Sequence, residues 1–298
     1  MKILITDGIS ENGRKILEQA GHECVIEHYE PEELIQKIPE FDAILVRSAT
    51  KVPKEVIDAG KKLKVIARGG AGIDNIDHSY AKSLGIPVLN TPGANSASVA
   101  ELALAHILAL SRYIHLANVT MREGKWEKKK YKGIEVNGRI LGIVGYGKIG
   151  RLLAEKAIAL GMKVLVYDVV DVETKLPVTK VSLDELLEKS DFVSLHVPKM
   201  PKPLIDVEAL KKMKKTAYLI NCARGGVVDE KALLDALNAG EIAGAGLDVY
   251  EEEPTRNLEL VSHPKVSVTP HVGASTVEAQ DRVGIEIATK IVEALKNS

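Results

Sequence analysis

Aromatic side chains and cysteines are both scarce in this 298-residue sequence. Aromatics make up 4% of the chain, so a packed core has to be built mainly from Val, Ile, Leu and Ala. Only Cys24 and Cys222 occur, far apart and in no C-x-x-C spacing. This excludes a disulfide framework and a thiolate metal site, and it fits a reducing cytoplasm.

The sequence also lacks an excess of charge and a long hydrophobic run. Lys and Arg (40) nearly balance Asp and Glu (41), which leaves no general basic field for nucleic acid or an acidic membrane. The basic stretch at 125–132 is typical of a solvated loop. The most apolar window is interrupted by Glu101 and His106, well short of a membrane span, and the first ten residues turn polar too soon for a signal peptide. We therefore expect a cytoplasmic protein that acts on a small molecule, with no nucleic-acid or membrane partner.

Short β-branched runs that alternate with amphipathic segments are the main pattern that is present. Such alternation predicts doubly wound α/β lobes with parallel sheets. The first lobe ends near residue 93, and its strands are expected at 2–7, 23–29, 42–48, 64–70 and 86–91. Strands of the second lobe are expected at 139–145, 163–168, 191–197, 216–223, 243–249 and 265–271.

Two long helices are expected outside this alternation. One runs from about Ser96 to Ile114 and is apolar on nearly every side, so it should be buried or pack against another subunit. The other, at 275–296, is long enough to return to the first lobe.

A glycine-spaced loop, G-Y-G-K-I-G at 145–150, lies between a predicted strand and a predicted helix. Gly145 permits the tight turn, Gly147 lets backbone approach a pyrophosphate, and Gly150 lets the helix pack closely on the sheet. Asp168 ends the next strand, eighteen residues after Gly150, where a carboxylate accepts the ribose hydroxyls. The pattern predicts a dinucleotide site.

A phosphate-binding P-loop is the competing interpretation, because Gly142–Lys148 matches G-x-x-x-x-G-K. However, Ile149 stands where Ser or Thr would hold Mg²⁺. Asp168 would repel a 2′-phosphate, and the following VVDV offers no Arg to receive one, so NAD is favoured over NADP.

Three kinds of chemically useful side chain follow successive strands of the second lobe. Arg224 suits bidentate carboxylate binding, and His271 suits proton exchange near neutral pH. Asp248 and the three glutamates 251–253 lie between them, and a glutamate beside His271 would stabilise its imidazolium form. Taken singly, these residues could equally be a surface ion pair, a structural histidine and a solvated turn. The other histidines show no metal-ligand spacing, so no metal is predicted.

Four motifs in this order, GYGKIG, NCARGGVVDE, GLDVYEEEP and TPHVGAST, make the whole sequence resemble the D-isomer-specific 2-hydroxyacid dehydrogenases. The resemblance implies a catalytic set of Arg224, Glu253 and His271, with Lys148 and Ile149 at the phosphates and Asp248 near the nicotinamide. The motif and the resemblance together place at NAD the residues Gly145, Gly147, Lys148, Ile149, Gly150, Asp168, His196, Val197, Pro198, Cys222, Ala223, Arg224, Asp248, His271, Gly273 and Ala274.

The resemblance also implies a split substrate domain. A flavodoxin-like domain would comprise residues 1–94 and 276–298, and a Rossmann NAD domain, 95–275, would be inserted into it. The active site would lie in the cleft between the two, where 68–72 presents backbone donors to the substrate.

Within the family, the stretches 46–52 and 90–102 look like the D-3-phosphoglycerate dehydrogenase branch. The implied reaction is oxidation of 3-phosphoglycerate to 3-phosphohydroxypyruvate by NAD⁺, the first step of serine biosynthesis. The substrate contacts would then be Arg47, Ser48, Gly70, Asn95 and Arg224, although Arg47 could instead form a salt bridge between the lobes. A homodimer through the helix around 98–113 is also implied.

Two departures from that branch stand out. The chain stops at Ser298 without the serine-binding regulatory domain of many phosphoglycerate dehydrogenases, so serine feedback is expected to be absent. The loop 196–206 is shorter than usual and lacks a threonine. The alternatives are the same chemistry on glyoxylate, hydroxypyruvate or a D-lactate-like acid, and, from another class, an NAD(H)-sensing binding protein.

Overall fold

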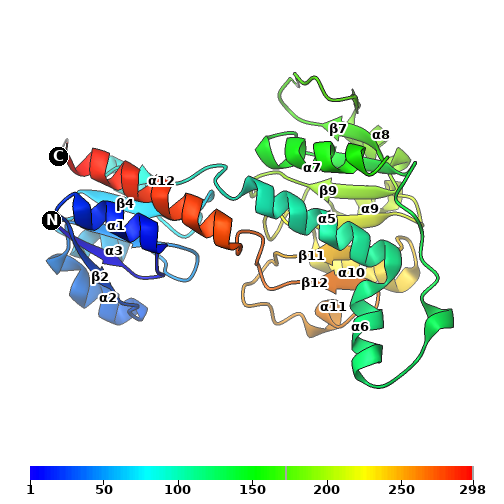
Figure 1. Ribbon diagram of the computed structural model, residues 1–298, viewed down its shortest axis with the longest axis horizontal. Helices are drawn as coiled ribbons and strands as arrows, with labels where there is room; N and C mark the ends of the chain where they lie inside the picture. Colours follow the sequence, from blue (N-terminus) through cyan, green and yellow to red (C-terminus); the bar gives the residue numbers. More distant parts are fainter. Residues whose placement is uncertain (172, 297–298) are drawn as a thin grey trace. The chain divides into compact units, whose positions relative to one another are not determined.

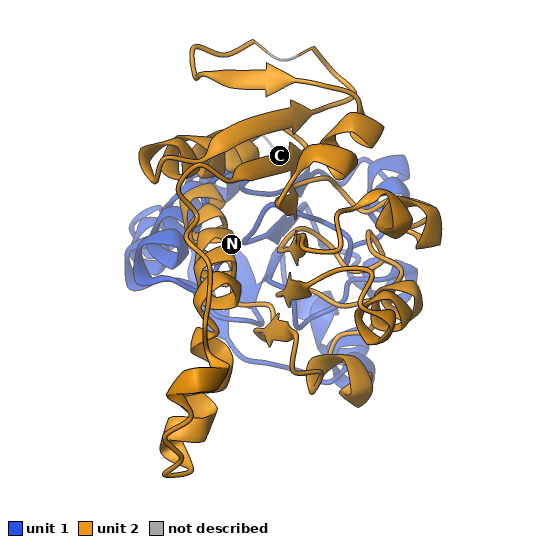
Figure 2. Ribbon diagram, turned by 90° about the vertical axis from the view of Figure 1, so that its right-hand side faces the viewer, with its two compact units in different colours: residues 1–95, 274–298 blue, residues 96–273 orange. Residues whose placement is uncertain are grey.

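The computed structural model describes residues 1–171 and 173–296, and the chain divides into two compact units (Figure 2). Unit 1 comprises residues 1–95 and 274–298, and unit 2 comprises residues 96–273. The unit boundaries lie within two residues of the domain boundaries expected from the sequence. Val172, part of the VVDV stretch, and residues 297–298, the end of the expected C-terminal segment, lie outside the described residues.

Unit 1 is built on a five-stranded parallel sheet in the order β2-β1-β3-β4-β5, the flavodoxin-like order (Figure 1). Its strands are β1 (Lys2–Ile5), β2 (Glu23–Ile26), β3 (Ala43–Val46), β4 (Val65–Arg68) and β5 (Val88–Leu89). Its helices are α1 (Glu11–Gln19), α2 (Pro31–Lys37), α3 (Lys54–Ala59), α4 (His78–Ser83) and α12 (Val277–Lys296), with the 3₁₀ turn η1 (Ile38–Glu40).

The C-terminal helix α12 completes the core of unit 1. Its buried face, which includes Ile287 and Ile291, packs with Leu17 of α1 against one side of the sheet, while α2, α3 and α4 cover the other side. At the surface, Asn12 of α1 donates to Asp281 of α12 at 3.0 Å. Segments from the two ends of the sequence therefore share one hydrophobic core.

Unit 2 contains a seven-stranded parallel sheet in the order β12-β11-β10-β9-β6-β7-β8, the Rossmann order with one additional strand. Its strands are β6 (Ile140–Val144), β7 (Lys163–Tyr167), β8 (Val178–Lys180), β9 (Phe192–Leu195), β10 (Tyr218–Asn221), β11 (Gly244–Leu247) and β12 (Val266–Val268). The predicted fold class, two doubly wound parallel-sheet domains, is confirmed. The short edge strand β8 was not predicted, because only Val178 among its three residues is apolar.

Helices cover both faces of the second sheet. They are α5 (Ser96–Arg112), α6 (Ile114–Arg122), α7 (Lys148–Ala159), α8 (Leu183–Lys189), α9 (Val207–Lys212), α10 (Glu230–Ala239) and α11 (Leu258–Val261), with the 3₁₀ turn η2 (Lys128–Lys130). Buried residues of α5 and α7 share one core against the sheet, and those of α8, α9 and α10 share the other.

The helix predicted to run to Ile114 ends earlier. Tyr113 has a left-handed backbone (φ 55°), which closes α5 at Arg112 and starts α6 in a new direction, 68° away. Among the described residues no single helix has the length and hydropathy of a membrane span, and only the bent α5–α6 pair reaches those values together.

Candidate active site

The carboxyl edge of the seven-stranded sheet carries the residues that the sequence singled out in unit 2. β6 has β7 on one side and β9 on the other, so the chain reverses its winding direction there. In doubly wound sheets ligands bind at such a switch point, beside the carboxyl ends of the strands. The glycine loop follows β6, and Arg224, Asp248 and His271 follow β10, β11 and β12.

The glycine loop has the geometry that a pyrophosphate needs. Gly145 has φ 92°, and a side chain there would collide with the carbonyl of His196. Gly147 is the N-cap of α7, and among the described residues no side chain caps this helix and no atom lies where a Cβ of Gly147 would point. The first turn of α7, with Lys148 and Ile149, therefore offers backbone N–H groups to an anion.

Two further polar groups lie at this end of the sheet. Asp168, after β7, accepts hydrogen bonds from the N–H of Tyr146 at 2.6 Å and of Val170 at 3.2 Å, so it is tied to the glycine loop. His196, after β9, contacts Ser194 Oγ through Nε2 at 2.9 Å. Its Nδ1 is buried and has no hydrogen-bond partner among the described residues, and burial lowers its pKa to about 4. A bound dinucleotide fits this donor set and this unfilled space.

His271 and Glu253 form the closest contact between predicted catalytic residues. His271 Nδ1 lies 2.6 Å from Glu253 Oε2, and Glu253 Oε1 accepts the N–H of Tyr250 at 3.1 Å. Burial raises the pKa of Glu253, but the hydrogen bonds from His271 and Tyr250 and the charges of His271 and Arg224 lower it overall. A carboxylate held in this way fixes the orientation of the imidazole through Nδ1, which leaves Nε2 available for proton exchange.

The neighbouring glutamates have other partners. Glu251 accepts the N–H of Glu230 at 3.0 Å and donates its own N–H to the Glu230 carboxylate at 2.7 Å. Glu252 pairs with Arg256 at the surface at 3.7 Å. Of the three residues 251–253, Glu253 is thus the one that contacts His271.

Asp248 organises the turn that carries His271. This buried carboxylate accepts the Thr269 hydroxyl at 2.6 Å and the N–H groups of Val272 and Gly273 at 2.8 and 2.9 Å. His271 has φ 53°, a conformation that costs a non-glycine residue about 1–2 kcal/mol, and the flanking hydrogen bonds hold it there. Both oxygens of Asp248 therefore bind the chain itself, a role that the sequence did not indicate.

Arg224 lies in the loop between β10 and α10 and is half-buried. Its Nη1 donates to the carbonyl of Ala223 at 2.7 Å, and its own carbonyl accepts Asn221 Nδ2 at 3.1 Å. Cys222 and Ala223, which precede it, are buried, and burial raises the pKa of the Cys222 thiol, so this thiol stays neutral and unreactive. The remaining predicted cofactor residues, Val197, Pro198 and Ala274, follow β9 and the His271 turn.

In unit 1, Arg47 follows β3 in a rigid loop. Asp7 accepts the N–H groups of Arg47 and Thr50 and the Thr50 hydroxyl, at 2.7, 3.0 and 2.7 Å. Asn75 Nδ2 donates to the carbonyls of the same two residues at 2.7 and 2.6 Å. Burial raises the pKa of Asp7, but the hydrogen bonds from Thr50 and Arg47 and the charge of His28 lower it overall. Asp7 is therefore a carboxylate that stabilises the loop carrying Arg47.

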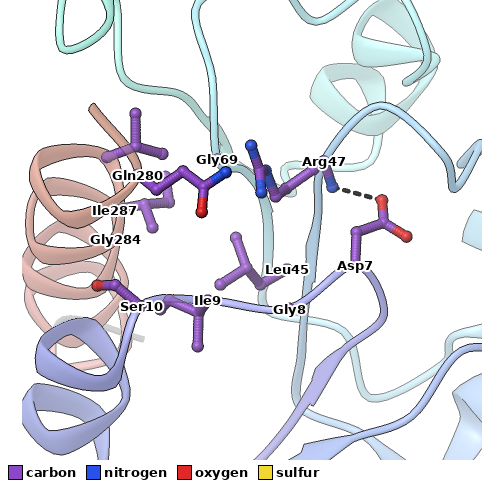
Figure 3. Close-up of a pocket in the computed structure, with 11 residues that line it drawn as sticks. Asp7, Gly8, Ile9, Ser10, Leu45, Arg47, Gly69, Gln280, Gly284 and Ile287 are labelled. Carbon is purple, nitrogen blue, oxygen red and sulfur yellow. Dashed lines mark hydrogen bonds between the residues drawn. The ribbon is translucent and has the colours of Figure 1, made fainter. Parts of the chain in front are cut away.

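A cavity of about 250 Å³ lies beside this loop within unit 1 (Figure 3). Arg47 and Gln280 of α12 extend their side chains over it, and Ser10 and Gly69 also line it. Within the described part of the chain the Arg47 guanidinium makes no ion pair or side-chain hydrogen bond. Sequence reasoning missed Asp7 and Gln280, although Asp7 follows a strand just as Asp168 does.

The other predicted substrate contacts differ in how available they are. Ser48 is exposed, and Asn95 has a buried Oδ1 with no hydrogen-bond partner among the described residues. The N–H groups of Gly69 and Gly70, in contrast, bond to the carbonyls of Val46 and Arg68 at 2.9 and 3.0 Å. The expectation that 68–72 presents backbone donors is therefore corrected for these two residues, because the N–H of Gly69 bonds to β3 and that of Gly70 closes a local turn.

The fold and the site define a dinucleotide-dependent dehydrogenase, and comparison with known proteins agrees. Residues 104–273 match the model of the D-isomer specific 2-hydroxyacid dehydrogenase NAD binding domain. Hydroxypyruvate reductase of Thermotoga maritima is 48% identical over 99% of this chain and 98% of its own length. D-3-phosphoglycerate dehydrogenase of Sus scrofa is 45% identical over 99% of this chain, which spans 56% of that protein.

Solved structures extend the similarity to the whole fold. The TT0316 protein of Thermus thermophilus has a TM-score of 0.92 and 33% identity, over 100% of this chain and 97% of its own. An NAD-dependent formate dehydrogenase of Staphylococcus aureus in complex with NAD has a TM-score of 0.87 and 30% identity, over 100% and 96% of the two chains. The chain belongs to the D-isomer-specific 2-hydroxyacid dehydrogenase family, and its cofactor is NAD.

Proposed function

We propose that this NAD-dependent dehydrogenase oxidises D-3-phosphoglycerate to 3-phosphohydroxypyruvate and catalyses the reverse reduction. The observation that carries the proposal is the Arg47 guanidinium over the cavity in unit 1, which makes no ion pair or side-chain hydrogen bond with the described residues. A guanidinium matches a phosphate with two parallel hydrogen bonds, and here its loop is held in place by Asp7 and Asn75 before any ligand arrives. Gln280 and Ser10 supply neutral polar groups beside it.

We propose that unit 2 holds NAD and performs the chemistry, while unit 1 recognises the distal end of the substrate. Arg224 binds the substrate carboxylate and polarises the neighbouring carbonyl. His271 exchanges the hydroxyl proton through Nε2, and Glu253 keeps the ring oriented through Nδ1. When bound, the nicotinamide supplies or accepts the hydride. Asp168 and the first turn of α7 hold the ribose and the phosphates.

Comparing 3-phosphohydroxypyruvate with hydroxypyruvate tests this proposal. The initial rate of NADH oxidation at 340 nm is measured for both acids with the wild type, Arg47→Ala and Arg47→Lys. We expect Arg47→Ala to lower kcat/KM about a hundredfold on the phosphorylated acid and much less on hydroxypyruvate, because only the phosphorylated acid has a phosphate that would lose its partner. Arg47→Lys keeps the charge and should recover part of the preference.

If Arg47→Ala lowered kcat/KM equally on both acids, Arg47 would not be the residue that recognises the phosphate. Hydroxypyruvate reduction is the second candidate, favoured by the similarity to the Thermotoga maritima enzyme along its full length. A wild type that turns over hydroxypyruvate faster than its phosphorylated form would establish it. Tight NADH binding with no absorbance change on any 2-oxo acid would instead favour an NAD(H) sensor.

We also propose a homodimer, with a contact different from the one expected. Apolar residues of α5 such as Val99, Ala103 and Ile107 are buried inside unit 2. The exposed apolar side chains follow in α6 and beyond, where Ile114, Val119, Met121 and Trp126 are each more than half exposed. Sedimentation of Met121→Glu should give a monomer if α6 forms the contact, whereas Val277→Glu, on the exposed side of α12, should not change the state. A cytoplasmic location remains a prediction.

A further inference from the structure

His106, a histidine of α5 far along the sequence from the catalytic residues, is almost completely buried at 3% exposure. Both of its ring nitrogens have partners on β12 and just beyond it. Nδ1 lies 2.9 Å from Ser267 Oγ, and Nε2 lies 3.2 Å from Thr269 Oγ1. Ser267 and Thr269 are two residues apart, on β12 and directly after it, so both face α5. The imidazole thus bridges two hydroxyls directly before the turn that holds His271.

The donors and acceptors at Nε2 have only one consistent arrangement when Asp248 is ionised. Thr269 has a single hydroxyl proton, and Asp248, 2.6 Å away, can only accept it. Thr269 Oγ1 must then accept from His106 Nε2–H, and in a neutral ring Nδ1 accepts the hydroxyl proton of Ser267. A neutral ring satisfies all of these bonds. Burial lowers the pKa of His106 despite the opposing charge of Asp248, in agreement with a neutral ring.

The same hydrogen-bond chain continues to the catalytic turn. Asp248 accepts the N–H of Val272 and of Gly273, the two residues that follow His271. Because His271 has a left-handed backbone, its ring direction depends on those two bonds. The Thr269 hydroxyl is the only side-chain donor to Asp248 within the described residues. The hydrogen bond that Thr269 Oγ1 accepts from His106 Nε2–H directs this hydroxyl toward Asp248.

We propose that His106 is a positioning residue for His271, acting through Thr269 and Asp248. By donating to Thr269, it commits the threonine hydroxyl to Asp248, and the carboxylate then holds the turn at the angle at which His271 meets Glu253. The proposal rests on the role of His271 in proton exchange. It concerns only the Nε2 side of His106, so the two ring nitrogens should be separable by substitution.

Four variants separate the two nitrogens. His106→Gln places an amide donor near the Nε2 position, whereas His106→Asn reaches only the Nδ1 position. Thr269→Val has the shape of threonine without its hydroxyl. Ser267→Ala removes the Nδ1 partner and leaves the Thr269–Asp248 bond intact, so it is the matched control. For each variant, kcat and KM are measured on the 2-oxo acid that the wild type reduces fastest, together with the NADH dissociation constant and Tm.

We expect His106→Asn and Thr269→Val to lower kcat about tenfold, because a misdirected imidazole slows proton exchange, while NADH binding changes less than threefold. His106→Gln and Ser267→Ala should stay within about threefold of the wild-type kcat. The double variant His106→Asn/Thr269→Val should be no slower than either single variant, because both break the same chain.

Hydrogen–deuterium exchange of the amides of Val272 and Gly273 provides a readout that does not require any substrate. These amides should exchange faster in His106→Asn and Thr269→Val than in His106→Gln and Ser267→Ala. Equal exchange in all four variants, or equal kcat for His106→Asn and His106→Gln, would overturn the proposal. If no 2-oxo acid is turned over, the proposed function fails, and the exchange pattern still decides the structural part.

Discussion

The carboxyl edges of the two parallel sheets are built in the same way but differ in how their polar side chains are used. On the edge of unit 2, His271 is paired with Glu253, Asp248 is saturated by its own turn, and Asp168 is bonded to the glycine loop. On the edge of unit 1, the backbone around Arg47 is fixed, yet its guanidinium has no partner among the described residues, and Asn95 Oδ1 also lacks one there.

Under the proposed function, this difference corresponds to a division between residues that catalyse the reaction and residues that recognise the substrate. Groups that must act on every substrate are oriented in advance by internal hydrogen bonds, which lowers the cost of reorganisation during the reaction. Groups that select the substrate, such as Arg47, would find a hydrogen-bond or ionic partner only when the substrate binds. Substitutions on the edge of unit 2 should therefore reduce turnover of every acid, and those on the edge of unit 1 should change which acid is preferred.

Arg224→Lys should have the largest effect. Lysine keeps the charge but loses the planar pair of donors, so we expect kcat/KM to fall about a thousandfold on phosphorylated and unphosphorylated acids alike. Steady-state rates at 340 nm provide the measurement. Arg256→Lys, at an exposed surface pair, is the matched control and should leave kcat/KM unchanged. A loss confined to one acid would place Arg224 among the recognition residues instead.

Glu253→Gln should have the next largest effect, and its pH profile should differ from that of the wild type. Burial raises the pKa of Glu253, but the hydrogen bonds from His271 and Tyr250 lower it overall, so the wild-type carboxylate keeps its charge until the pH falls through that lowered value. Removing this charged acceptor should lower the reduction rate at neutral pH about thirtyfold and abolish the loss of rate that protonation of the carboxylate causes at acid pH. Glu252→Gln is the control. A variant that keeps the wild-type profile would exclude Glu253 as the partner of His271.

Two alanine substitutions in the glycine loop should behave differently from each other. A methyl group at Gly147 meets open space, so Gly147→Ala should leave Tm unchanged while weakening NADH binding about tenfold, because it occupies the approach of the phosphates. A methyl group at Gly150 would collide with the carbonyl of Gly145, so Gly150→Ala should weaken binding and also lower Tm. NADH binding is measured by fluorescence titration and Tm by thermal unfolding. Equal Tm values for Gly147→Ala and Gly150→Ala would contradict the expected difference.

The smallest effect that we expect is on stability, and it comes from His196. Burial lowers its pKa to about 4, from an ordinary value of 6.5, so the folded chain keeps the ring neutral where the unfolded chain protonates it. This stability is present above pH 6.5 and is lost as the pH falls toward 4. Between pH 7 and pH 5, wild-type Tm should fall about 5 °C more than that of His196→Asn. Parallel curves would contradict this account.

The fold was largely predictable because its signal is local and repeated. Alternating strand and helix patterns identified both sheets, and the prediction of two doubly wound parallel-sheet domains holds. The predictions failed where local patterns are weak. The strand β8 has only one apolar residue, and the turn at Tyr113 that ends α5 depends on a backbone conformation that no residue type there requires.

The site was predictable at strand ends but not across elements. Arg224, Glu253 and His271 lie in recognisable motifs. The residues alone did not distinguish Glu253 from Glu251 and Glu252, but the family resemblance singled it out, and in the structure Glu253 is the one of the three that contacts His271. The hydrogen bonds of His106 join residues more than 160 positions apart, and the cavity beside Arg47 is lined by both ends of the chain. Periodicity and spacing carry no information about such contacts.

The hydrogen bonds from Val272 and Gly273 to Asp248 lie directly before the point where the chain passes from unit 2 to unit 1, between residues 273 and 274. The last two residues of unit 2 are thus held by a buried carboxylate, so we expect a displacement of the chain beyond residue 274 to change the orientation of the His271 ring little.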